Sequence, residues 1–297
     1  MTQDDTRDDL KNFASLVDAL SPWLEQMVII GGWAHRLYRL HHFAQPLDYE
    51  PLATFETDVA VPVELPRCGE GIRERLVANG FTEELFGETR PPAIHYRLIA
   101  GGTGFYAEFL TPLVGSANKG GKRDATASIA GVSAQKLRHL ELLLASPWQV
   151  EIGPATGFPT AGSYQVQIPN PAAFLAQKIL IHERRELGDR AKDLLYLHDT
   201  IEVFGSVLPE LQKLWRESVR PLLSAKAVRS VEAAPKTLFG EVTNAAREAA
   251  RMAAGRPLRG ALSASNAAGS AWKAAVYGSS SLACKQRGVD GRKPSAT

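Results

Sequence analysis

Two carboxylates stand close together in the stretch Phe55–Val61, which is rich in β-branched residues and contains no glycine, as is typical of a strand. Side chains of a strand alternate between its faces, so Glu56 and Asp58 share one face about 7 Å apart along the backbone, and the residues between and after them point into a core. Two like charges on an apolar strand repel. A divalent cation such as Mg²⁺, which prefers hard oxygen ligands, would relieve the repulsion. A solvated sheet edge would do so too, and for such a pair alone it is the commoner explanation.

A third carboxylate, Glu108, occupies a second predicted strand, Phe105–Leu110, which Thr111 and Pro112 close. If this strand neighbours the first one in a sheet, Glu108 completes a cluster of three acids with Glu56 and Asp58.

A glycine pair separates a short apolar strand, Met27–Ile30, from a predicted helix, Trp33–Leu40. Glycine lacks a β-carbon, so backbone at Gly31 and Gly32 can approach a ligand closely, and the start of the following helix offers free N–H groups that suit a phosphate. A plain tight turn is the alternative. Arg36 on the same helix could contact phosphate or remain solvated.

Length and composition fit a globular protein of about two domains, with 297 residues, 44% of them hydrophobic and 22% charged. The net charge of +2 does not indicate a nucleic-acid binder, although six basic residues and one acidic residue follow position 256. The two cysteines lie far apart, which is consistent with a reducing cytoplasm. We find no signal peptide and no apolar run near the ~20 residues needed to cross a membrane, so a cytoplasmic protein without a membrane partner is expected.

The order of predicted elements indicates an α/β fold of the α+β kind: a small mixed sheet in residues 1–168, a helical domain in 169–256 and a disordered basic tail in 257–297. Pro169-Asn170-Pro171 marks the first boundary, because proline is favoured in the first turn of a helix. Within the first domain we expect a loop over 83–92 and, from leucines at helical spacing, a helix over 133–145. The second domain should hold helices over 172–186, 189–204 and 209–219, and the alanine-rich stretch 243–254 could form another.

Lys178 shares a largely apolar helix face with Phe174 and Ile181, so its amine needs a partner. The alternative is a lysine whose stem packs while its amine reaches water.

The order of strand, Gly-Gly, helix, acid-x-Asp strand and later single-acid strand resembles the polymerase-β-like nucleotidyltransferase superfamily. More narrowly, Ile30–Ala34, Thr54–Val59 and Glu108–Leu113 are similar to a bacterial group of uncharacterised nucleotidyltransferase-fold proteins, which looks related to the nucleotidyltransferase toxins of abortive-infection systems. The resemblance covers roughly residues 27 to 204.

This resemblance implies a nucleoside triphosphate substrate, with Gly31 and Gly32 touching the triphosphate and the three acids holding two Mg²⁺ ions, for which Mn²⁺ could substitute. Lys178 matches a family lysine that reaches the triphosphate. Asp193, in Lys192-Asp193-Leu194, matches a Lys-Asp-Leu of the toxins in which the Asp is important, and here it could orient Lys178 or Arg185 or be a surface acid.

Three acids suit nucleotidyl transfer, in which a hydroxyl attacks the α-phosphorus and pyrophosphate leaves, because two metals about 3.5–4 Å apart stabilise the attacking and leaving oxygens. We expect Asp58 to bridge both ions with the help of Glu56, and Glu108 to hold the metal nearest the hydroxyl and act as its base.

The resemblance also implies acceptors: RNA first, particularly the 3′ end of tRNA, and then a protein hydroxyl or a small molecule. A cognate antitoxin would be a partner. One residue departs from the family pattern, since Glu56 stands where Asp is usual and its longer side chain alters metal geometry. The alternative function is therefore a catalytically degenerate nucleotide- or RNA-binding protein.

Overall fold

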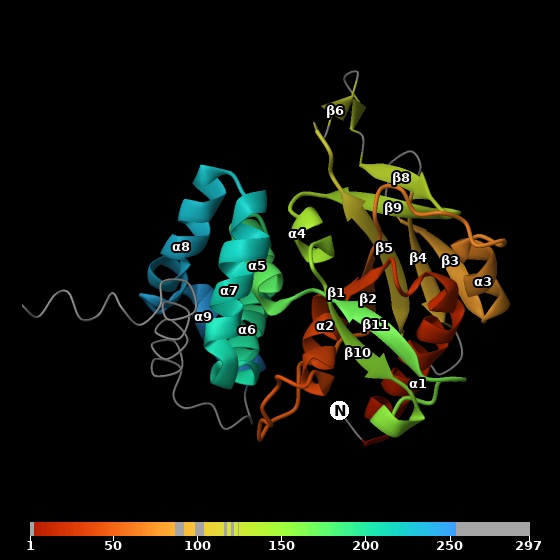
Figure 1. Ribbon diagram of the computed structural model, residues 1–297, viewed down its shortest axis with the longest axis horizontal. Coiled ribbons are helices and arrows are strands. Elements are labelled where there is room, and N and C mark those ends of the chain that lie inside the picture. Colours follow the sequence, from red (N-terminus) through yellow and green to blue (C-terminus); the bar gives the residue numbers. More distant parts are fainter. Residues whose placement is uncertain are drawn as a thin grey trace, which may run out of the picture.

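The structure is a computed structural model that describes residues 3–86, 92–98, 104–115, 118–119, 122–123 and 125–253. It has a mixed β-sheet with helices against it on one side, and a group of helices on the other (Figure 1). The predicted fold class, a mixed-sheet core followed by helices, is confirmed. The predicted tail, 257–297, lies outside the described residues.

Seven strands of the described chain form the main sheet: β1 (Val28–Ile30), β2 (Glu56–Ala60), β3 (Phe81–Phe86), β4 (Ala93–Leu98), β5 (Tyr106–Pro112), β8 (Thr126–Ile129) and β9 (Val132–Leu137). Their order is β1-β2-β5-β4-β3, and β9 pairs with both β5 and β8. The central pair β2–β5 is parallel, whereas β1–β2 and β4–β5 are antiparallel. Two smaller hairpins complete the strands: β6 (Asn118–Lys119) with β7 (Lys122–Arg123), and β10 (Trp148–Ile152) with β11 (Tyr164–Ile168).

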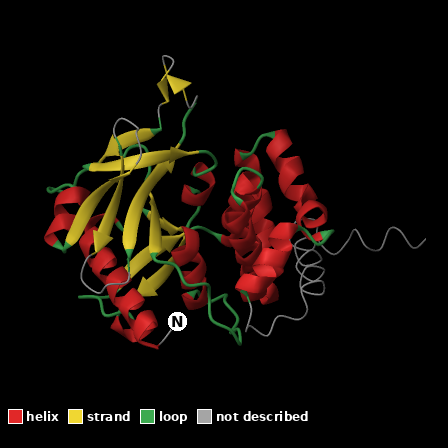
Figure 2. Ribbon diagram, turned by 180° about the vertical axis from the view of Figure 1, so that it is seen from behind, coloured by secondary structure: helices red, strands yellow, loops and turns green. Residues whose placement is uncertain are grey.

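The helices fall into two groups, which Figure 2 shows from behind. Those beside the sheet are α1 (Gln3–Leu20), α2 (Gly31–Leu37), α3 (Ile72–Ala78) and the short α4 (Glu141–Leu144). The second group comprises α5 (Pro171–His182), α6 (Leu187–Val203), α7 (Leu208–Leu214), α8 (Ala225–Phe239) and α9 (Asn244–Met252). Short 3₁₀ turns occupy Ser21–Trp23, Tyr38–Leu40, Pro154–Thr156, Gly205–Val207 and Arg220–Leu222, and a π-helical turn, Trp215–Val219, continues α7.

The helix expected over residues 133–145 is wrong. Residues 132–137 form β9, and only Glu141–Leu144 is helical. The leucines at helical spacing are real, but β5 continues past the end of β4 and offers backbone partners to β9, with Leu110 opposite Gln135. Tertiary pairing therefore overrides the local pattern, which is common for short segments.

The loop expected over residues 83–92 is also wrong in its first part, because Phe81–Phe86 forms β3 at the sheet edge. The segment was predicted as a loop because it is polar, but its charged residues Glu83 and Glu84 form ion pairs on the edge strand. Glu83 lies 2.7 Å from Arg73, and Glu84 lies 2.7 Å from Arg97. Charged side chains are a usual feature of edge strands, where they discourage pairing with other chains.

The junction between the sheet and the second group of helices is fixed by hydrogen bonds at the start of α5. Asn170 caps this helix, since its side-chain oxygen accepts from the Ala173 amide at 2.9 Å, and Pro171 follows in the first turn. The other end of the Asn170 amide donates to the Ala145 carbonyl at 3.0 Å. The buried Tyr38 hydroxyl donates to the Pro169 carbonyl at 2.9 Å. These contacts set the distance between α5 and the sheet, and the proposed domain boundary falls here.

None of the described helices combines the length and the apolar character that crossing a bilayer requires.

Candidate active site

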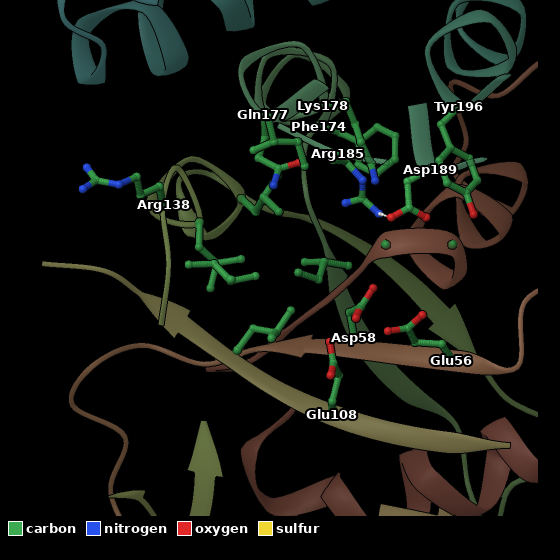
Figure 3. A pocket seen from close by; sticks show the side chains of 18 of the residues that line it. Glu56, Asp58, Glu108, Arg138, Phe174, Gln177, Lys178, Arg185, Asp189 and Tyr196 are labelled. Atoms are coloured by element: carbon green, nitrogen blue, oxygen red, sulfur yellow. Dashed lines mark ion pairs between the residues drawn. The ribbon is translucent and has the colours of Figure 1, made fainter. Parts of the chain in front are cut away.

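The parallel pairing of β2 and β5 places Asp58 directly opposite Glu108, and Glu56 lies two residues earlier on the same face of β2. One carboxylate oxygen of each acid lies within 4.8 Å of the other two. Figure 3 shows the three side chains pointing into one cavity from the sheet. The condition on which the three-acid cluster depended, neighbouring strands, is thus met. Three carboxylates at this spacing are the hard oxygen donors that fit a divalent ion such as Mg²⁺ or Mn²⁺.

Burial and mutual repulsion oppose the ionisation of this cluster. Desolvation raises the pKa of Asp58 well above its usual value, and the neighbouring charges of Glu56 and Glu108 raise it further. The hydrogen bond of Asp58 with the Glu108 side chain raises the pKa of Asp58 as well. Burial and then Glu108 raise the pKa of Glu56. A bound cation would reverse both effects, since opposite charge favours the ionised form.

Further side chains hold the two outer acids in place. Gln135 donates through Nε2 to Glu108 Oε2 at 3.1 Å, and His95 Nε2 lies 3.3 Å from the same oxygen. The Tyr106 hydroxyl donates to Glu56, and its ring stacks on that of His95 with centroids 4.6 Å apart.

These supporting residues were missed from the sequence. His95 faces the site because β4 pairs with β5, which puts His95 opposite Glu108. Strand alternation alone could have placed Tyr106 on the face of Glu108, two residues away. Gln135 was missed because the sequence analysis assigned it to a helix, whereas it lies in β9.

The glycine pair begins α2 beside the acids. Gly31 has a φ of +63°, and a β-carbon there would come within 2.0 Å of Asp58 Oδ2. A β-carbon at Gly32 would lie 2.8 Å from Thr54 Cγ2 and 2.9 Å from the Tyr196 hydroxyl. Both positions therefore require glycine, and the backbone at Gly31 lies against the carboxylate of Asp58.

A cavity of about 620 Å³ separates the acids from α5 and α6. Figure 3 shows Lys178 and Arg185 on the helix side, opposite the three carboxylates. The basic residues that line this cavity are Lys136, Arg138, Lys178, Arg184, Arg185 and Lys192. An acidic floor facing a basic wall can bind a metal and a polyphosphate at the same time.

Asp193 organises the basic wall from α6. It is fully buried, with Oδ1 3.0 Å from Lys178 Nζ and Oδ2 3.4 Å from Arg185 Nε. The Lys178 amine lies 5.0 Å from the ring centroid of Tyr196, and Arg185 also pairs with Asp189 at 3.2 Å. Of the two roles considered for Asp193, the surface acid is excluded, because Asp193 is buried and contacts both Lys178 and Arg185. The Lys178 amine likewise has a partner in Asp193 and is not directed to bulk water.

Arg36 does not line this cavity. Its guanidinium lies 4.8 Å from the ring centroid of Trp33 and 3.9 Å from the carboxylate of Asp9, on the side of α2 that packs against α1. The geometry corrects the expectation that Arg36 contacts nucleotide, because the helix turns its side chain away from the glycine pair.

Comparison with known proteins agrees with this geometry. The model of a family described as "Nucleotidyltransferase" matches residues 8–220, which is most of the chain. The chain belongs to this nucleotidyltransferase family, and it is accordingly an enzyme of the class that transfers nucleoside monophosphates.

Among solved structures, the chain is similar to MenT4, a nucleotidyltransferase toxin from Mycobacterium tuberculosis H37Rv, with 14% sequence identity and a TM-score of 0.40. The match covers 91% of this chain and 84% of MenT4. No curated protein matches the sequence.

Proposed function

We propose that this chain is a Mg²⁺-dependent nucleotidyltransferase that moves a nucleoside monophosphate from a nucleoside triphosphate to a hydroxyl of RNA. The observation that carries the proposal is the cluster of Glu56, Asp58 and Glu108 across one cavity from Lys178 and Arg185. Glu56 does not disrupt the cluster, because its carboxylate lies within 4.8 Å of the other two in spite of the extra methylene.

Glu56, Asp58 and Glu108 would hold the divalent ions, which supply Lewis-acid stabilisation of the attacking and leaving oxygens. The same three carboxylates would also bind Mn²⁺. The raised pKa of Asp58 supports this assignment, since buried acids that repel each other are stabilised by a cation.

The remaining groups of the chain bind and orient the substrate. Gly31 and Gly32 let backbone approach the triphosphate, and Lys178 and Arg185, held by Asp193, offset its negative charge. As the acceptor oxygen bonds to the α-phosphorus, the bond from that phosphorus to the bridging oxygen breaks and pyrophosphate leaves. Glu108, at the sheet side of the cavity, would take the proton of the acceptor hydroxyl.

Lys136, Arg138 and Arg184 also line the cavity and favour an acceptor that itself carries phosphates. The motif resemblance to abortive-infection toxins makes the 3′ end of tRNA the first acceptor to examine and an antitoxin a partner of the chain. A protein or small-molecule hydroxyl is the next acceptor in order.

A label-transfer assay tests the proposal. Purified protein, Mg²⁺, each α-labelled nucleoside triphosphate in turn and total RNA with cell extract are combined. We expect labelled RNA with the wild type and with Asp48→Ala, a change at an exposed acid outside the cavity, and no label with Asp58→Ala.

A labelled protein band in place of RNA would reject the RNA acceptor while keeping the transferase. Nucleotide binding without transfer in the folded wild type would reject catalysis. It would instead support the alternative function, a nucleotide- or RNA-binding protein without catalysis, which the replacement of the usual Asp by Glu56 suggested.

A further inference from the structure

A second cavity of about 420 Å³ lies among the helices, away from the carboxylate cluster. The end of α5, the start of α6 and the turn from α8 to α9 enclose it, and Figure 1 shows these helices gathered in the second group. Leu187, Leu194 and Leu238 give it apolar walls. Its volume falls within the range of small-molecule sites, about 300–1,000 Å³.

Two side chains of this cavity each have one buried nitrogen without a hydrogen-bond partner in the described part of the chain. His182 is only 5% exposed, and its Nδ1 has no hydrogen-bond partner among the residues that the structure describes. Arg190, one turn into α6, has a buried Nε without a partner, and its guanidinium enters no ion pair of the described chain. Buried polar nitrogen without a partner is uncommon, because each such group loses its hydration without compensation.

The first turn of α9 faces the same cavity. Thr243 caps this nine-residue helix by accepting from the Ala246 amide at 3.1 Å. The amides of Asn244 and Ala245 have no acceptor within the helix, and both residues line the cavity. The start of a helix carries a partial positive charge and binds anions through such amides. One carboxylate, Glu183, also lines the cavity, but it is exposed and screened by water.

We propose that this cavity is a second binding site, which takes a small organic phosphate separately from the active site. Arg190, His182 and the start of α9 would hold the phosphate, and the leucine walls would cover the apolar part of the molecule. An arginine with a helix N-terminus is a common combination for phosphate, because both present N–H donors. The inference does not depend on the proposed RNA acceptor.

Any test must distinguish phosphate binding in this cavity from binding in the active site, because His182 follows Lys178 by one turn of α5. The experiment is calorimetric titration of inorganic phosphate and of phenyl phosphate into the full chain. The variants are Arg190→Gln in the second cavity, Lys178→Met in the active site and Arg229→Gln on the exposed side of α8 as the matched control. Melting temperatures establish that each variant is folded.

We expect saturable binding of one molecule per chain, tighter for phenyl phosphate, in the wild type and in the Lys178→Met and Arg229→Gln variants. Arg190→Gln should weaken it at least tenfold, about the effect of one charged hydrogen bond. If Arg190→Gln does not fold, His182→Gln is titrated in its place, and it should weaken phosphate binding as well.

Equal affinity in Arg190→Gln and wild type would overturn the site. So would loss of binding in Lys178→Met with retention in Arg190→Gln, which would place the phosphate in the active site. If neither ligand shows saturable binding at concentrations up to about 10 mM, the site is overturned as well, because a Kd above this range is weaker than that of a specific site.

Discussion

Gly31 and Asp58 touch at the end of the first strand pair: a β-carbon on Gly31 would lie 2.0 Å from Asp58 Oδ2. The antiparallel register causes this contact, because Ile30 stands opposite Asp58 and Gly31 follows it directly. The chain therefore cannot carry a side chain at this position without displacing the central carboxylate of the cluster. Gly31 also has a φ of +63°, which L-residues rarely adopt.

Replacing Gly31 with alanine should abolish transfer while leaving the protein folded. Backbone strain alone costs about 1–3 kcal/mol, and the clash adds displacement of Asp58. We expect activity to fall by at least about 100-fold, the size of a misplaced catalytic group. Gly157→Ala is the matched control: its φ is +85°, but no atom of the described residues lies within 4 Å of the added carbon. Label transfer and melting temperature are measured together. Equal activity losses in the two variants would show that strain, and not the contact with Asp58, is responsible.

The sequence was sufficient for the parts of the site that follow from local alternation and turn chemistry. Glu56 and Asp58 share a face because a strand alternates. The sequence also placed the Gly-Gly turn between an apolar strand and a helix, although α2 begins at Gly31 itself and not at Trp33. The third acid needed one assumption, that β5 neighbours β2, which the family resemblance made reasonable. The start of α5 at Pro171 was also a local feature, since the proline there indicates the first turn of a helix.

The remainder depended on pairings between distant segments, which no local pattern contains. Gln135 reaches Glu108 only because β9 joins the far part of β5. Arg36 looked suitable for phosphate by its position near the glycines, but the face of α2 that carries it packs on α1. The second cavity requires the packing of α8 and α9, and no helix over 225–239 was expected.

Tyr106→Phe should weaken metal binding by removing the hydroxyl that donates to Glu56. A hydrogen bond to a charged group contributes about 1.5–3 kcal/mol, so we expect the Kd for Mn²⁺ to rise about tenfold or more. Calorimetric titration with Mn²⁺ measures it without turnover. Tyr164→Phe is the control, because Tyr164 also hydrogen-bonds to a carboxylate, Asp18, far from the cavity. An unchanged Kd in Tyr106→Phe would mean that Glu56 is positioned without it.

Asp193→Asn should raise the KM for nucleoside triphosphate and destabilise the fold. The change keeps the shape of the side chain but leaves the buried Lys178 amine, 3.0 Å away, without a counter-charge. Breaking a buried ion pair typically costs about 3–5 kcal/mol. Asp189→Asn is the comparison, because the ion pair of Asp189 with Arg185 lies at a more exposed position, where about 1 kcal/mol or less is expected. Urea unfolding and KM are measured for both. Equal effects of the two substitutions would contradict the central role of Asp193.

Protonation of His41 should destabilise the fold as the solution is acidified from neutral pH. His41 is buried, its ring stacks on Trp148 with centroids 4.1 Å apart, and its Nδ1 accepts from the Phe43 amide at 3.2 Å. Accepting at Nδ1 requires the neutral ring. Burial, with a smaller contribution from the charge of His42, lowers the pKa of His41 from 6.5 to about 4.

The sign of the effect follows from proton binding. Between about pH 6.5 and pH 4 the unfolded chain holds a proton at His41 that the folded chain lacks, so the free energy of unfolding decreases as pH falls through this window. The loss should be about 1–3 kcal/mol, the smaller value applying if water screens part of the charge. His41→Gln should flatten the pH dependence of unfolding in urea, whatever it does to stability at pH 7. His42→Gln, at the exposed neighbouring position, should leave most of that dependence in place. If His41→Gln and wild type lose stability in parallel from pH 7 to pH 4, another group governs the acid response.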